Sequence, residues 1–180
     1  MNSAEGPFRS FIYSLFDGPV SQRVLEEKPD KGNCRFAIQQ YFKETRGIYL
    51  SHSEIVLPYA RNNSRGTFIE NNQVDSNEFF SGLQEGDIIY AEKLRDSHGK
   101  KIKSGKEKFE TEYERLVHLH LAVYVGLPTD EILAFFSGDE IDRDKPAIWH
   151  STFIARGTAL WSVEKFRHYY KPESAMRMAI

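Results

Sequence analysis

The chain of 180 residues contains a single cysteine, Cys34, and this scarcity excludes several structural roles. One cysteine cannot form a disulfide within the chain, and it cannot build a zinc site from several cysteines. Neither exclusion affects a reactive thiol, which needs only one residue. Cys34 is therefore either a small buried apolar residue or a nucleophile.

A strong net charge and long apolar runs are also absent. The formal net charge is −2 at pH 7, so no general basic field attracts nucleic acid or an anionic membrane. No window approaches the roughly 20 apolar residues of a membrane-spanning helix, and no basic region precedes the first apolar patch, as a signal peptide requires. We expect no nucleic-acid or membrane partner, and a cytoplasmic location or export without a cleaved signal peptide.

The length and composition predict one folded domain. With 40% hydrophobic residues, the chain can bury a core, and 180 residues leave little room for a second domain. We expect a single domain over residues 1–180, in which 1–32 form an N-terminal extension and 93–115 a charged loop insertion. The lysines of residues 93–108 predict a solvated surface, with an acidic partner or substrate as the alternative.

The clearest local pattern is a helix that begins near the cysteine. Asn33 is a favoured helix cap, and apolar residues then recur at helical spacing from Cys34 to Tyr41. Gly47 is a typical C-terminal stop. Cys34 therefore lies in the first turn, where free N–H groups and the helix dipole are expected to lower the pKa of its thiol.

The rest of the chain predicts mainly strands. Residues 61–82 are polar and predict a loop with one helical turn. A strand is expected over residues 87–92, and short apolar and aromatic runs then alternate with turn residues, as in antiparallel strands. These runs are VHLHLAVYVGL, EILAFFSG, AIWHSTFIA and TALWSV, followed by a short helix in SVEKFRHYYKP. Helices before a sheet indicate an α+β fold with a mainly antiparallel sheet.

Three histidines on these predicted strands could activate a thiol. His118 and His120 are two residues apart and so point to the same face of one strand. His150 lies in another strand among apolar neighbours, where an imidazole needs a hydrogen-bonding partner that a second histidine can supply. A thiol nucleophile needs such a base, with a third group to orient it.

Four segments resemble the NlpC-type cysteine peptidases, a branch of the papain-like proteins. NCRFAIQQYF is similar to the family's cysteine helix, LQEGDIIYAE to its Gly-Asp strand, HLAVYVG to its histidine strand and IWHST to its third polar position. The resemblance implies a papain-like α+β core in which the cysteine helix packs on the sheet. It implies Cys34 as nucleophile, His120 as general base and His150 as orienting residue, with no cofactor. The backbone N–H of Cys34 would belong to the oxyanion hole.

The implied reaction is cleavage of a peptide or amide bond, for example in peptide stems of bacterial cell walls. Asn33 replaces the usual Asp, Arg35 and Phe36 replace Ser-Gly, and no Tyr lies between Tyr13 and the cysteine. These differences motivate an alternative, an inactive papain-like fold that binds a peptide or partner. A thioester-forming acyltransferase is a further alternative, because an amine or alcohol can capture the acyl group instead of water.

Two alternatives concern the histidines. His118 shares a predicted face with His120 and is its rival as general base. His118, His120 and His150 could also share one Zn²⁺, because imidazoles two apart on a strand can bind one ion together with a third. No carboxylate at a fixed spacing completes such a site, so our prediction names no metal.

Overall fold

A computed structural model describes residues 33–56, 65–71, 76–128, 130, 133, 141–152 and 157–179. The predicted extension 1–32 and the strand predicted in EILAFFSG lie outside the described residues, except for Leu133. The elements in chain order are α3 (Asn33–Arg46), α4 (His52–Ile55), β1 (Gly66–Glu70), α5 (Ser76–Ser81), β2 (Ile88–Lys93), α6 (Gly105–Lys108), α7 (Glu112–Val117), β3 (His120–Gly126), β4 (Ala147–Thr152), β5 (Gly157–Ser162), α9 (Val163–Tyr169) and β6 (Tyr170–Met178).

Six of these elements form one antiparallel sheet. The strand order is β1-β6-β2-β3-β4-β5, and every neighbouring pair is antiparallel. Sequence neighbours β3, β4 and β5 lie side by side, whereas β6 inserts between β1 and β2. The mixture of helices and an antiparallel sheet confirms the predicted α+β class. Among the described residues, no helix combines the length and apolarity that crossing a membrane requires.

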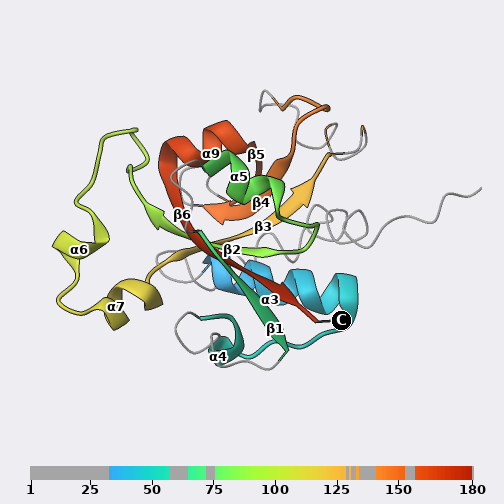
Figure 1. Cartoon of the computed structure of the whole chain (residues 1–180), viewed down its shortest axis with the longest axis horizontal. Helices are drawn as coiled ribbons and strands as arrows, with labels where there is room; N and C mark the ends of the chain where they lie inside the picture. The colour runs from blue at the N-terminus through green and yellow to red at the C-terminus, as the bar shows by residue number, and fades with distance from the viewer. Residues whose placement is uncertain are drawn as a thin grey trace, which may run out of the picture.

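Helices cover both faces of the sheet (Figure 1). Helix α3 packs on one face, and α5 and α9 lie on the other. Because side chains alternate along a strand, each strand contributes to both cores. The α3 core includes Ile38, Tyr41, Val123, Trp149 and Leu160, and the opposite core includes Phe80, Ala122, Ile148, Trp161 and Phe166.

The helix predicted around the cysteine is confirmed. It begins at Asn33 and ends at Arg46, and Gly47 follows with φ +64°. The N–H groups of Gly47 and Ile48 donate to carbonyls of the last turn, which closes the helix end. Cys34 lies in the first turn and packs beside the α3 core, as the periodicity predicted.

Two predictions for the middle of the chain were wrong. Residues 61–82 contain strand β1 as well as the helical turn α5. The strand was missed because its partner is β6, from the far end of the chain, so no local signal marks the pairing. The strand predicted to hold both His118 and His120 begins only at His120, because His118 caps the C-terminus of α7.

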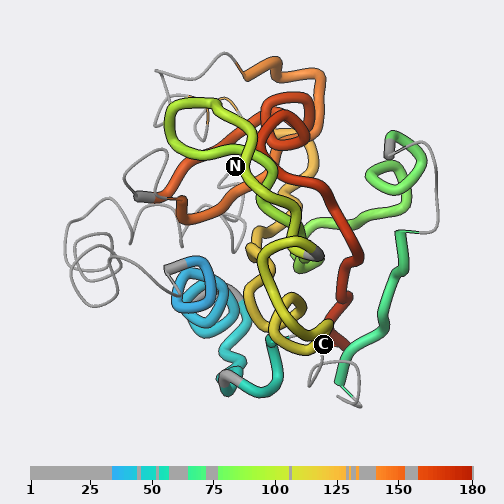
Figure 2. The backbone as a smooth tube through the Cα atoms, turned by 90° about the vertical axis from the view of Figure 1, so that its left-hand side faces the viewer, coloured from blue at the N-terminus to red at the C-terminus, as the bar shows by residue number. Residues whose placement is uncertain are grey.

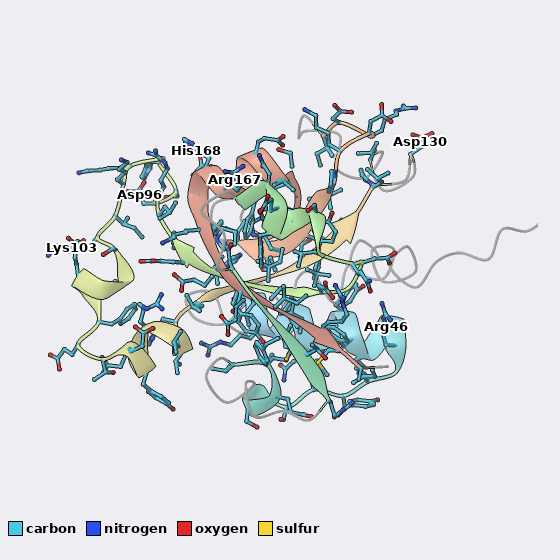
Figure 3. All side chains as sticks on the ribbon, viewed as in Figure 1. Arg46, Asp96, Lys103, Asp130, Arg167 and His168 are labelled. Carbon is cyan, nitrogen blue, oxygen red and sulfur yellow. The ribbon has the colours of Figure 1, made fainter. Side chains whose placement is uncertain are left out.

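Residues 94–119, called the excursion below, extend from the sheet between β2 and β3. Figure 1 shows α6 and α7 projecting at the left of the sheet, Figure 2 views them from that side, and Figure 3 marks Asp96 and Lys103 on the excursion. A bridge pairs Arg95 with Lys101, and the N–H of Leu94 donates to the carbonyl of Tyr169 at 2.7 Å. The bridge closes the excursion on itself, and the bond from Leu94 fastens its start to the junction of α9 and β6.

A buried guanidinium fastens the far part of the excursion to the sheet. Arg115 of α7 is 7% exposed and pairs with Glu112 at 2.6 Å and with Glu173 of β6 at 3.0 Å. The two carboxylates raise the pKa of Arg115 further above its ordinary value, mainly through the hydrogen bonds that Arg115 donates to Glu112. The helices α6 and α7 are therefore held against the end of β2 and β6.

We expect Asp87→Ala to destabilise the fold. Asp87 is 2% exposed, receives two bonds from Arg177 at 3.0 and 2.7 Å, and accepts the N–H of Gln84. Removing the carboxylate leaves these donors unpaired, which costs about 1–3 kcal/mol. Urea unfolding would measure the change. As a control, Arg143→Ala breaks an exposed pair with Asp130 and should cost less than about 1 kcal/mol; equal effects would contradict this account.

Candidate active site

The candidate site is centred on a hydrogen bond between two imidazoles. His120 opens β3, His150 lies in β4, and His120 Nε2 is 2.8 Å from His150 Nδ1. The pairing that the sequence suggested for the strand histidine is thus present. Because one nitrogen must donate and the other accept, two tautomer pairs satisfy the bond.

Aromatic rings enclose this pair on the α9 face of the sheet. Tyr170, at the start of β6, stacks on His120 with ring centroids 4.2 Å apart and an interplanar angle of 17°. Trp161 meets His150 at 4.5 Å and 73°, and Phe166 meets it at 5.5 Å and 70°. His150 Nε2 has no hydrogen-bond partner among the described residues. When the proton is on that nitrogen, its surroundings among the described residues include the rings of Trp161 and Phe166.

Strands β3 and β4 diverge where β3 begins, at the end of the sheet that carries His120. Their paired residues start at Val123 and Trp149, so residues 120–122 pair only with β2. The backbone N–H of Leu121, next to His120, lies close enough to Cys34 to lower the pKa of its thiol. The thiol also acts electrostatically on the ring of Tyr170. Helix α3 thus brings the thiol to the histidine strand from the opposite face of the sheet.

Burial sets the protonation state of the thiol. Burial raises the pKa of Cys34 above its ordinary value, and hydrogen bonds from backbone N–H groups and the charge of Arg35 only partly offset it. The sequence predicted a lowered pKa from the helix terminus alone. That prediction was wrong in direction, because desolvation of the anion outweighs the helix-end donors.

Burial also keeps both imidazoles neutral. It lowers the pKa of His120 to about 3, with a smaller contribution from the charge of Lys93. Burial, His120 and Lys165 lower the pKa of His150 well below its ordinary value. At neutral pH the site therefore holds a neutral thiol beside two neutral imidazoles. These directions oppose a resting thiolate–imidazolium ion pair.

His118 does not join the pair. Its ring stacks on Phe109 at 4.7 Å, and its Nδ1 is 2.7 Å from the carbonyl oxygen of Glu114. This removes the geometric basis for His118 as the base and for a site of three histidines around Zn²⁺. Among the residues that the structure describes, no group of three or more His, Cys, Asp or Glu side chains is placed to hold a metal ion.

Sequence reasoning missed two residues of this site. Tyr170 comes from near the C-terminus, and its hydroxyl is 2.9 Å from Thr152 Oγ1. Nothing in the run HYYKP shows which tyrosine faces the histidines, because that depends on the register of β6. Arg35 departs from the family pattern, and its guanidinium donates to the carbonyl of Val117, which ties the start of α3 to the end of α7.

Comparisons with protein-family models, with curated proteins and with solved structures found no match. The functional argument therefore depends on the residues of this chain and on their geometry.

The neutral site predicts an alkaline reactivity profile. Since the thiol pKa is raised, the thiolate fraction at pH 7 is below that of a free cysteine, whose pKa is about 8.5. We expect alkylation of Cys34 by iodoacetamide to keep rising with pH beyond that value. Intact mass measures the reaction unambiguously, because the chain has one cysteine. A rate plateau at pH 5–7 would instead indicate a thiolate–imidazolium pair.

The stacked ring predicts a positioning role for Tyr170. Tyr170→Leu removes the ring that fixes the plane of His120 and should slow alkylation of Cys34 at pH 7 by about tenfold, toward the rate of His120→Ala, because small misplacements of a base are costly. Tyr170→Phe keeps the ring and should stay within about twofold of wild type. Thermal unfolding checks that both variants fold. Equal rates for the two variants would contradict the role.

Proposed function

We propose that the protein is a cysteine amidohydrolase with a papain-like core of the NlpC type. In this proposal Cys34 is the nucleophile, His120 the general base and His150 the residue that orients the base. The observation that carries it is the 2.8 Å bond between His120 Nε2 and His150 Nδ1. That bond occupies one nitrogen of His120 and leaves Nδ1 for the thiol.

The tautomer of the pair decides whether His120 can act as a base. When His120 Nε2–H donates to His150 Nδ1, His120 Nδ1 carries a lone pair and can accept a proton. The proton of His150 is then on Nε2, among the faces of Trp161 and Phe166. An N–H group is tolerated there because ring faces are weak acceptors. His150 therefore fixes the base-competent tautomer without carrying charge.

In the proposed reaction, both the thiol of Cys34 and the imidazole of His120 start neutral. As Cys34 Sγ attacks the carbonyl carbon, its proton passes to His120 Nδ1 and an S–C bond forms. Backbone N–H groups at the start of α3 stabilise the oxyanion. The C–N bond breaks, and the amine leaves with the proton from His120. Water, deprotonated by the same imidazole, then cleaves the thioester and restores the thiol.

Support for the papain-like core comes from the order and placement of three anchors. A cysteine in the first turn of α3, a histidine that opens β3 and a histidine on β4 follow the order of the family pattern. The helix packs on the sheet, as that resemblance implies. Peptide amides are therefore the first substrate class to test, and cell-wall stem peptides are one candidate within it.

One observation favours the alternative of a peptide-binding module. The raised pKa of the Cys34 thiol makes the resting site less nucleophilic than an ion pair would be. An inactive fold would keep the aromatic enclosure and the buried histidines but would not transfer an acyl group. Acylation of the cysteine by an activated ester separates the two functions without knowledge of the natural substrate.

We therefore expect p-nitrophenyl acetate to acetylate Cys34 and the acyl-enzyme to turn over. Release of nitrophenol and the intact mass report the two steps. His120→Ala should slow acylation by about 10²–10⁴-fold, the usual contribution of a general base. His118→Ala is the matched control, because it removes a neighbouring imidazole that lies outside the pair, and it should leave the rate within about twofold.

The outcomes separate the candidate functions. Equal rates for wild type and His120→Ala in folded protein would contradict the general-base role and favour the binding module. Faster loss of the acyl-enzyme with added amine, together with an amide product, would identify acyl transfer. Cys34→Ala must abolish acylation in either case, because it removes the only thiol of the chain.

A further inference from the structure

The charges at this end of the sheet are divided between its two faces. Successive side chains of a strand point to opposite faces. Glu92 faces the excursion, where its carboxylate accepts the N–H of Gly105. Glu173 also turns to that side, since it pairs with Arg115 at 3.0 Å. The carboxylates near the end of β2 are therefore engaged on the face opposite the histidines.

Lys93 lies on the histidine face. Ala91 pairs directly with His120, and Lys93, two residues further along β2, pairs directly with Tyr170. Directly paired residues share a face, with Cβ atoms roughly 4.5–5.5 Å apart. Because Tyr170 stacks on His120 at 4.2 Å, the stem of Lys93 begins beside the ring that covers the base. The side chain is exposed and has no ion pair among the described residues.

Other cations at the site are held in place by contacts. The guanidinium of Arg35 donates to the carbonyl of Val117, and Lys165 Nζ lies 4.9 Å from the centroid of the Trp161 ring. No carboxylate among the described residues contributes to the pKa shift of either histidine, whereas Lys93 and Lys165 both do. Lys93 and Lys165 are both exposed cations on this face; Lys165 lies over the Trp161 ring, whereas Lys93 pairs directly with Tyr170, the residue stacked on His120.

We propose that Lys93 forms an anion subsite beside His120, so that the preferred substrate carries a carboxylate close to the amide that is cleaved. This inference rests on the proposed function, because it assigns a substrate class to the same site. An ammonium group on a flexible stem suits the role, since it can reach an anion in more than one position. It would also raise the local concentration of anionic substrates.

Two alkylating reagents test the subsite without the natural substrate. Iodoacetate and iodoacetamide both form an S–C bond with Cys34 and release iodide, but only iodoacetate carries a negative charge. The measured quantity is the ratio of their rates, divided by the same ratio for N-acetylcysteine. We expect the wild-type ratio to favour iodoacetate, Lys93→Gln to lower it by about threefold or more, and Lys93→Glu to lower it further.

Lys171→Gln is the matched control. Lys171 is an exposed lysine of β6 that pairs directly with Glu92, so it lies on the opposite face and its loss changes the net charge equally. It should leave the ratio within about 1.5-fold, because exposed charges across the sheet are screened by water and salt. An equal fall in both variants, or no fall in Lys93→Gln, would overturn the subsite.

The result also separates this inference from the proposed function. If acylation of Cys34 depends on His120 but the reagent ratio does not change when Lys93 is substituted, only the subsite is overturned. A reagent ratio that responds to Lys93, in a protein that never turns over an acyl-enzyme, supports an anion-binding site and overturns the hydrolase. Alkylation that occurs only after unfolding overturns both, because the folded site would then exclude reagents from the thiol.

Discussion

The hydrogen bond between His120 and His150 is the constraint on which the rest of the site depends. The nitrogens of the two imidazoles are 2.8 Å apart, so the rings cannot both be protonated. Burial lowers the pKa of both histidines and keeps the pair neutral. In a neutral pair, the nitrogen that carries the proton of this bond determines which nitrogen of His120 has a free lone pair. The aromatic rings around His150 bear on the pair through the tautomer that they favour.

The sheet determines how a thiol can meet this pair. The histidines project from the α9 face, whereas α3 packs on the other face with a separate core. At the end where β3 and β4 diverge, the backbone of Leu121 lies close enough to Cys34 to lower the pKa of its thiol. The same end carries the excursion, fastened by Leu94 and by the buried Arg115. A mobile surface segment would not hold charged side chains in fixed places around the site.

The raised pKa of the thiol is a consequence of this arrangement. A helix terminus alone lowers the pKa of a thiol, but here the cost of desolvating the thiolate is larger. A neutral pair accelerates acyl transfer only when the proton moves as the S–C bond forms. In the proposed hydrolase, the ring stacked on His120 would hold the orientation that such a transfer requires of a base.

Much of this protein follows from local sequence signals. The helix from Asn33 to its stop at Gly47, the strands around His120 and His150, and the short helix that begins after Ser162 are set by apolar periodicity and by turn and capping residues. These signals lie within a few residues of one another, so the sequence alone determined them. The candidate residues Cys34, His120 and His150 were also chosen from the sequence, by their order and by the elements that carry them.

Only the tertiary structure decided the relations between distant segments. Strand β1 depends on β6, the position of Tyr170 over His120 depends on the register of β6, and His118 turns away because α7 ends one residue before it. The direction of the pKa shift of the Cys34 thiol was also decided by the tertiary structure. Burial, register and pairing depend on segments that are far apart in the chain, and no local pattern of residues contains that information.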